Sequence, residues 1–247
     1  MLGHDPFADM ARATWEKAGV TSLATEHADS YTGAAYIFVD DATGDNAIIV
    51  CPGVAGTISV ADIDAQAETI RASKVFMTQF EQPLDAAERA LSFAKAAGAI
   101  TILNPAPAAD ASAPKLSHCA YITPDESEAE AITGVPVQSP ADATRAADVL
   151  LRKGAGAAII TLGENGCLYH DGTEPIHVPA LSAGPVMETT GAGDAFNGGL
   201  AAALAEGRAP IDAVKFGTAT AAISVTRQGT APAMPEREEI DALISAS

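Results

Sequence analysis

Residues 188–197 read Glu-Thr-Thr-Gly-Ala-Gly-Asp-Ala-Phe-Asn and continue into an Ala-rich, apolar stretch. Gly191 and Gly193 permit a tight turn and leave no Cβ atom to block an approaching anion. The N–H groups of Ala192, Gly193 and Asp194 would then open a helix, and N–H groups at a helix start favour phosphate. This stretch therefore predicts a loop that turns into a helix above an anion hole.

Asp194 lies inside this predicted hole, where its carboxylate would repel a phosphate that merely binds. A carboxylate at this point is suited to act as a general base on an attacking hydroxyl, while the N–H groups stabilise the transferring phosphoryl group. Asp is also a favoured residue at helix starts, so the local sequence leaves a plain structural cap open as well.

Working outward, short apolar strands alternate with amphipathic helices. Strands are predicted at 74–78, 100–103, 119–122 and 157–162, and helices at 60–71, 84–97, 127–132 and 141–153. This alternation indicates a doubly wound α/β fold, with a mainly parallel sheet and helices on both faces. The remaining elements are an antiparallel pair at 167–170 and 176–178, and helices at 195–206, 211–226 and 235–244.

The N-terminal part follows a different pattern. A helix is predicted at 8–18, and two strands at 34–39 and 47–51 flank a turn-rich link, which indicates a β-hairpin. Since no linker or repeat divides the sequence, residues 1–247 are expected to form one domain.

Polar residues follow the predicted parallel strands at their carboxyl ends, where open α/β sheets bind their ligands. The expected site therefore lies along one edge of the sheet. The segments concerned are 78–81, 104–107, 123–126 and 161–164.

The composition restricts the partners of the chain. Its 247 residues carry a formal charge of −18, which disfavours nucleic acid and anionic membrane surfaces. Cys51, Cys119 and Cys167 are far apart and form no CxxC pair, so neither a disulfide scaffold nor a structural zinc site is indicated. No apolar run approaches a membrane span, and the expected location is the cytoplasm.

The stretch 188–197 resembles the C-terminal signature of the ribokinase, or PfkB-type, carbohydrate kinases. The segment 79–83 (QFEQP) and the NPAPA stretch at 104–108 are more similar to ribokinases than to fructokinases or nucleoside kinases. Further matching segments are 2–7, 32–34, 123–130, 161–166 and 226–230.

The resemblance implies ATP-dependent phosphorylation of D-ribose to ribose 5-phosphate, with Asp194 as base and Gly191, Ala192 and Gly193 as anion hole. It also implies a lid from residues 31–51 that closes over the sugar and helps a homodimer to form. By position, the sugar contacts Glu81 and Asp194, Mg²⁺ and its waters lie near Glu128, and the nucleotide site comprises Asp125, Thr161, Gly163, Glu164, Gly166 and Thr218.

Some residues depart from the family pattern. In ribokinases an Asp at the position of Glu188 and a Ser at the position of Ala233 help to bind a monovalent cation, so K⁺ activation is expected to be weak or altered. Asp125 replaces an Asn beside the phosphates and adds negative charge there. The implied backbone ligands of the cation are Thr190, Ser224, Arg227 and Gly229.

Family members begin with a strand that carries a sugar-binding Asp, followed by a Gly-Gly-x-x-x-Asn segment, and this sequence does not contain them. We therefore expect a sheet without its N-terminal strands, with apolar surface exposed at its open edge. Two alternatives to a ribokinase stay open at this point. One is a kinase of another sugar or of a nucleoside, and the other is a non-catalytic relic that binds nucleotide.

Overall fold

The computed structural model describes residues 1–39, 46–108 and 115–246, and its central sheet holds six strands in chain order. β3 to β6 run parallel, whereas β7 and β8 are antiparallel additions, as the alternating pattern predicts. The strands are β3 (Val75–Thr78), β4 (Ile100–Leu103), β5 (Tyr121–Ile122), β6 (Ala157–Thr161), β7 (Cys167–His170) and β8 (Ile176–Val178).

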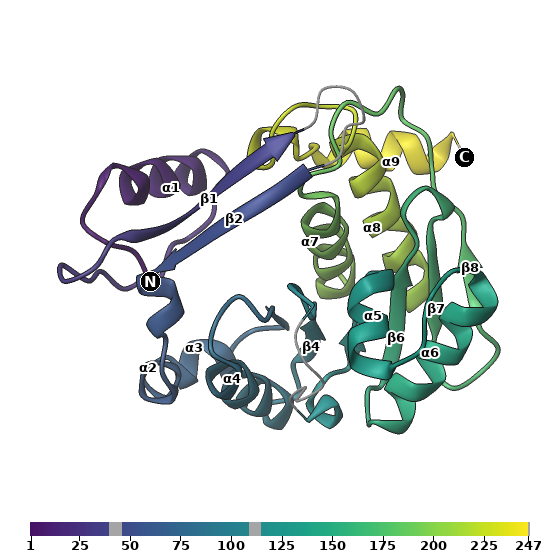
Figure 1. The fold of residues 1–247 in the computed structure, drawn as a ribbon, viewed down its shortest axis with the longest axis horizontal. Helices are drawn as coiled ribbons and strands as arrows, with labels where there is room; N and C mark the ends of the chain where they lie inside the picture. Colours follow the sequence, from purple (N-terminus) through teal and green to yellow (C-terminus); the bar gives the residue numbers. More distant parts are fainter. Residues whose placement is uncertain (40–45, 109–114, 247) are drawn as a thin grey trace.

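Helices cover both faces of this sheet (Figure 1). Successive residues of a strand point to opposite faces, so the neighbours Ile102 and Leu103 enter different core clusters. Leu103 packs among side chains of α4 (Leu84–Ala96), α5 (Glu126–Thr133) and α6 (Pro140–Arg152). Ile102 packs among side chains of α7 (Ala192–Ala205), α8 (Pro210–Ser224) and α9 (Arg237–Ser245). The predicted α/β class is therefore confirmed.

Two predicted elements differ from the observed ones. The helix expected at 60–71 is broken at Gln66 into α2 (Val60–Ala65) and α3 (Ala67–Arg71). Ile70 is the one residue that these two short helices bury within the described chain, so little packing holds them in line. The strand expected at 119–122 is shortened to β5, because the segment before it forms a 3-10 turn at Leu116–His118.

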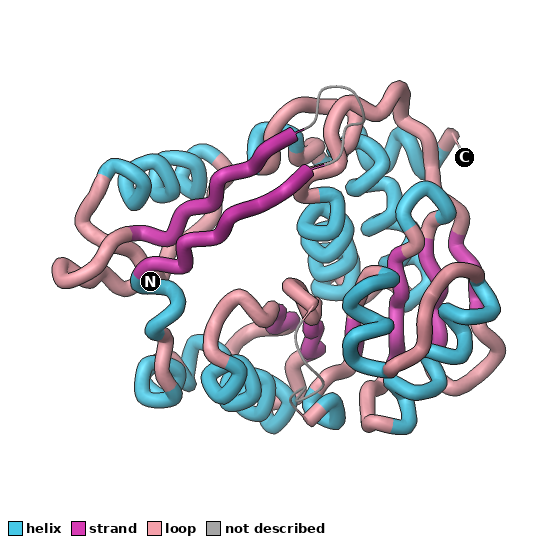
Figure 2. Tube along the Cα trace, in the orientation of Figure 1, coloured by secondary structure: helices cyan, strands magenta, loops and turns pink. Residues whose placement is uncertain are grey.

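The predicted hairpin is present as β1 (Thr32–Val39) and β2 (Asn46–Gly53), paired antiparallel (Figure 2). The turn-rich link at 40–45 lies outside the described residues. The hairpin exposes large apolar side chains, among them Tyr36 at 67%, Phe38 at 57% and Ile49 at 56%. It is therefore an arm beside the sheet rather than part of its core.

A single carboxylate joins this arm to α1 (Pro6–Lys17). Asp5 Oδ1 accepts from Ala8 N at 2.9 Å and caps the helix, while Asp5 Oδ2 accepts from Thr32 N at 2.7 Å. Gly3 N also donates to Thr32 Oγ1 at 2.9 Å. Hydrogen bonds from Thr32 and Ala8 hold the pKa of Asp5 below its ordinary range. The start of α1 therefore fixes the base of the hairpin.

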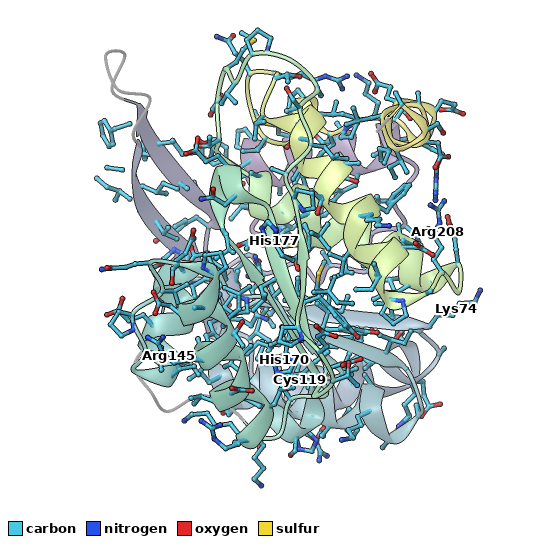
Figure 3. The ribbon with its side chains drawn as sticks, turned by 90° about the vertical axis from the view of Figure 1, so that its right-hand side faces the viewer. Lys74, Cys119, Arg145, His170, His177 and Arg208 are labelled. Carbon is cyan, nitrogen blue, oxygen red and sulfur yellow. The ribbon has the colours of Figure 1, made fainter. Side chains whose placement is uncertain are left out.

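A buried polar contact ties the outer layer to the antiparallel end of the sheet. His170 on β7 is 5% exposed, and its Nε2 lies 3.0 Å from Asp148 Oδ1 on α6 (Figure 3). The carboxylate partner spares Nε2 the cost of an unmade hydrogen bond, whereas Nδ1 of the same ring is buried without a partner among the described groups. In the part of the chain that the structure describes, no helix is both long enough and apolar enough to cross a bilayer.

Candidate active site

The stretch 188–197 forms the expected turn from loop into helix. Gly191 is the residue before α7 and has φ +79°, a left-handed conformation that favours glycine. Within the described residues, no side chain caps this helix. Asp194 is its third residue and its carboxylate points elsewhere, so the plain-cap interpretation left open by the sequence is wrong.

Fewer N–H groups are free to bind an anion than the sequence predicts. Ala192 N donates to Thr189 O at 3.1 Å, so this group is already engaged. Gly193 and Asp194 follow in the first turn, where N–H groups have no intrahelical acceptor. A Cβ built on Gly193 would meet no described atom outside its own helix turn within 4 Å, so the first turn is open on this side. Gly193 and Asp194 can therefore hold an anion, as a transferring phosphoryl group requires.

The loop before α7 is anchored on the end of α8. Met187 N and Glu188 N both donate to Val225 O, at 2.8 and 3.2 Å. Further along, α7 and α8 pack very closely, because a Cβ on Gly199 would lie 3.0 Å from the Cα of Gly217. These contacts fix the first turn of α7 relative to the rest of the domain.

A cleft of about 300 Å³ lies beside this first turn. It is formed at the carboxyl ends of β3 and β4, the sheet edge that the polar strand ends predict. Asp194 reaches into it, and its Oδ1 lies 3.3 Å from Nε2 of Gln79. The lining residues are Met77, Thr78, Gln79, Gln82, Asn104, Asp194 and Asn197.

Gln79 and Asn104 directly follow strands and lie in the polar segments that the sequence placed at the site, although it gave neither an individual role. The sequence did not single out Gln82 or Asn197. The predicted sugar contact Glu81 is exposed and is not part of the described lining. The neighbouring Gln82 lines the cleft and donates to Thr78 Oγ1.

Asp125 and Glu128 form a reciprocal cap at the start of α5. Asp125 Oδ1 accepts from Glu128 N at 2.7 Å, and Glu128 Oε2 accepts from Asp125 N at 2.9 Å. Burial raises the pKa of Glu128 to about 7, against an ordinary value of 4.5. Each carboxylate uses one oxygen in the cap.

Hard carboxylate oxygens such as these suit Mg²⁺, which keeps several waters and phosphate oxygens as its other ligands. Asp125 and Glu128 therefore fit an ion held partly by a nucleotide. Across the described ranges, no group of three or more His, Cys, Asp or Glu side chains forms a complete metal cage.

Four of the predicted nucleotide residues, Thr161, Gly163, Glu164 and Gly166, lie at the turn between β6 and β7. Gly163 and Gly166 both have positive φ, and a Cβ on Gly166 would lie 2.1 Å from Val178 O. Glu164 between them is exposed, and Thr161 Oγ1 donates to Pro124 O at 3.4 Å. The turn itself thus requires these glycines.

Thr218, which the resemblance places in the nucleotide site, is 7% exposed on α8. Its Oγ1 donates to Val214 O at 3.0 Å and lies 3.9 Å from Cys167 Sγ. The structure therefore places Thr218 in the core between α8 and β7, apart from the cleft of Asp194.

The residues implied for a monovalent cation do not fit one. Glu188 Oε2 accepts from Gly229 N at 2.9 Å, so this carboxylate bridges the two loops directly. Ser224 O accepts from Arg227 N at 3.1 Å, and Ala233 has no side-chain oxygen to offer. Thr190 Oγ1 is buried without a hydrogen-bond partner among the described groups.

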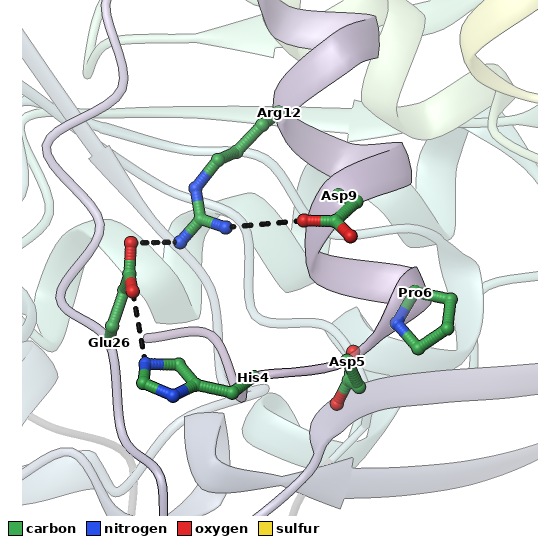
Figure 4. A pocket seen from close by; sticks show the side chains of 6 residues that line it. All are labelled: His4, Asp5, Pro6, Asp9, Arg12 and Glu26. Atoms are coloured by element: carbon green, nitrogen blue, oxygen red, sulfur yellow. Dashed lines mark hydrogen bonds and ion pairs between the residues drawn. The ribbon is translucent and has the colours of Figure 1, made fainter.

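Figure 4 shows a second hollow, of about 470 Å³, at the start of α1. Its charged groups are paired with one another: Glu26 lies 3.0 Å from His4 Nε2 and 2.6 Å from an Arg12 nitrogen, and Asp9 faces Arg12 at 3.9 Å. Asp5 on its rim is engaged with backbone N–H groups. This hollow is therefore a structural junction at the base of the hairpin.

Comparison with known proteins agrees with this geometry. A family model described as pfkB family carbohydrate kinase matches residues 1–237. The chain is 34% identical over 239 residues to a ribokinase of Haemophilus influenzae, covering 96% of this chain and 78% of the relative. It is 33% identical over 246 residues to a deoxyribokinase of Salmonella typhi, with coverage of 99% and 80%.

A solved structure of an Arabidopsis thaliana ribokinase, complexed with ribose and ATP, matches with a TM-score of 0.91 and 25% identity. The match covers 100% of this chain and 80% of that one. The family model and the relatives lead to the same conclusion. This chain belongs to the pfkB family of carbohydrate kinases, ATP-dependent phosphotransferases that act on a sugar hydroxyl.

Proposed function

We propose that this chain phosphorylates D-ribose to D-ribose 5-phosphate, with Asp194 as the general base. The observation that carries the proposal is the position of this carboxylate, in a cleft and directly beside the open N–H groups of Gly193 and Asp194. The similarity to a ribokinase of Haemophilus influenzae supports ribose as the acceptor.

In the proposed reaction an oxygen of Asp194 takes the proton of the sugar hydroxyl as that hydroxyl attacks the γ-phosphorus of ATP. The bond from the γ-phosphorus to the bridging oxygen breaks, and ADP leaves. The N–H groups of Gly193 and Asp194 stabilise the charge on the transferring group, which is the main contribution a protein makes to phosphoryl transfer. Mg²⁺ near Asp125 and Glu128 would neutralise phosphate charge when bound.

The same proposal assigns the turn with Gly163 and Gly166 to the nucleotide, and the hairpin β1–β2 to a lid over the sugar. A lid of this kind excludes water, which would otherwise accept the phosphoryl group. The exposed apolar side chains of the hairpin, such as Phe38 and Ile49, also favour pairing with a second copy. Light scattering of the wild type and of an Ile49→Ser variant tests this, and an unchanged monomer mass in both would overturn the dimer.

The experiment for the proposed function measures ADP release by the purified chain with D-ribose, 2-deoxy-D-ribose, D-fructose and adenosine. Ribose is expected to give the highest kcat/KM. Asp194→Asn keeps the shape of the side chain but removes the base, so it should lower kcat by about 10²–10⁴-fold. Absence of turnover with every acceptor, or full turnover of Asp194→Asn, would overturn the proposal.

Deoxyribose is the second candidate acceptor, because a deoxyribokinase of Salmonella typhi is as similar to this chain as the ribokinase is. The two sugars differ by one hydroxyl. A site built to bond that hydroxyl would reject deoxyribose strongly, whereas an apolar site would accept both. The ratio of the two kcat/KM values therefore decides between them.

A further inference from the structure

A ring of polar groups closes around the first turn of α7. It begins at Asp194, passes through side chains at the ends of three neighbouring strands, and returns to the residue before Asp194. The hydrogen bonds are Gln79 Nε2 to Asp194 Oδ1 at 3.3 Å, Gln79 Nε2 to Asn104 Oδ1 at 3.0 Å, Asn104 Nδ2 to Thr123 O at 2.9 Å, Thr123 Oγ1 to Asn197 Oδ1 at 2.7 Å and Asn197 Nδ2 to Gly193 O at 2.9 Å.

The direction of every bond in this ring is fixed by backbone carbonyls. Thr123 O can only accept, so the amide nitrogen of Asn104 must face it and the amide oxygen must face Gln79. That oxygen also can only accept, so Gln79 must present its nitrogen. The second hydrogen of this nitrogen is then directed at Asp194. On the other side, Gly193 O orients Asn197 in the same way.

The members of the ring differ sharply in exposure. Asn104 is 8% exposed, Thr123 2% and Asn197 4%, so the part of the ring that sets the polarity is buried. Gln79 is half-buried and Asp194 is exposed, and both line the cleft. A rigid, buried frame therefore supports one hydrogen bond at the surface of the cleft, and this bond ends on the carboxylate of Asp194.

We propose that Gln79 is a positioning residue for the reaction: it holds Oδ1 of Asp194 and leaves Oδ2 to receive the proton of the acceptor hydroxyl. This inference rests on the proposed role of Asp194 as base. It adds that the amide of Gln79 orients the base. The carbonyl of Thr123, through the Asn104 amide, fixes which end of the Gln79 amide faces Asp194. Small errors in the direction of a base reduce the rate strongly, since the attacking hydroxyl must lie within hydrogen-bond reach.

Two substitutions that preserve size separate positioning from packing. Gln79→Met keeps the volume but donates no hydrogen bond, and Gln79→Glu keeps the shape but directs an acceptor at Asp194 and at Asn104 Oδ1. We expect kcat to fall about tenfold for the first and further for the second, with both KM values within about twofold of wild type. Gln138→Met, at an exposed position before α6, makes the same chemical change and should leave kcat unchanged.

A packing role predicts the opposite order, with Gln79→Glu close to wild type in kcat or with changes in KM rather than kcat. Either result would overturn the proposal. Thermal unfolding of each variant confirms that it is folded. A wild type without turnover would instead contradict the proposed function, and a measurement that needs no turnover then decides about Gln79.

That measurement is the ¹H–¹⁵N NMR signal of the Gln79 side-chain amide, assigned by its loss in Gln79→Met. If the ring exists, Asp194→Asn and Asn104→Ala each shift this signal, because each removes or weakens one of its two acceptors. The Gln138 side-chain signal serves as the control and should not move. A Gln79 signal that stays in place in both variants would overturn the proposal.

Discussion

The role of Glu128 in stability and its proposed role in binding Mg²⁺ can be measured separately. Its side chain is 7% exposed, and burial raises its pKa to about 7 from an ordinary 4.5. The folded protein therefore binds a proton that the unfolded chain releases between these two values. Since the unfolded state binds fewer protons in this window, the free energy of unfolding falls as the pH rises from 4.5 to 7 and levels off above it.

The size of this effect follows from the difference between the two pKa values. Above pH 7 the ionised Glu128 lowers the free energy of unfolding by at most about 3 kcal/mol. This figure already includes the hydrogen bond from Asp125 N, which favours the carboxylate. Glu128→Gln removes the charge but keeps an oxygen that can accept from Asp125 N. We expect this variant to be more stable than wild type by about 1–3 kcal/mol at pH 8 and by clearly less at pH 5.

Urea denaturation at several pH values measures this difference, with Glu130→Gln, an exposed position on the same helix, as the control. The control should follow wild type at every pH. If the stabilities of Glu128→Gln and wild type also run parallel from pH 5 to pH 8, the burial argument is refuted. Mg²⁺-dependent turnover is the second readout, and we expect the loss of the carboxylate to lower it about tenfold. A variant that gains stability and keeps full turnover would leave Glu128 as a helix cap only.

Three further predictions concern contacts that hold neighbouring elements of the fold together. Gly199→Val should destabilise the fold by about 1–3 kcal/mol in thermal denaturation, because even a Cβ would lie 3.0 Å from Gly217 Cα; a loss below about 0.5 kcal/mol would contradict this. Asp5→Ala should lower the hydrogen-exchange protection factor of Thr32 N, and the protection factor of wild type should fall in the same way as the pH drops through the lowered pKa of Asp5, where the stability of this contact is lost. Because Glu188 Oε2 already accepts from Gly229 N and Ala233 offers no side-chain oxygen, turnover in K⁺ and Na⁺ salts should agree within about twofold, and strict K⁺ dependence would refute this reasoning.

The fold was predictable because its signals are local. Short apolar strands alternate along the chain with amphipathic helices such as α4, α5 and α6, and this alternation specifies a mainly parallel sheet without knowledge of distant contacts. The start of α7 was predictable for the same reason, since Gly191 needs its positive φ whatever surrounds it. The break at Gln66 was not, because it depends on how little of α2 and α3 is buried.

The side chains around Asp194 were harder to predict because their contacts are distant in sequence. Gln79 and Asp194 are separated by 115 positions, and the direction of the Gln79 amide depends on a carbonyl in a third segment. The choice of Gln82 over Glu81 as a lining residue depends on how the chain bends after β3, where strand alternation no longer applies. Motif matching finds such a segment but not the side chain that enters the cleft.

The charge of the cleft explains why Asp194 needs a donor beside it. Asp194 is the one ionisable side chain in the described lining of the cleft, in a protein with a formal charge of −18. Local positive potential for a phosphate must therefore come from the start of α7 and from any bound cation. An unpaired carboxylate at that point would oppose the same phosphate. A donor hydrogen of Gln79 on one oxygen offsets part of the charge of Asp194, which would let this carboxylate serve as the proposed base while the N–H groups beside it bind a phosphate.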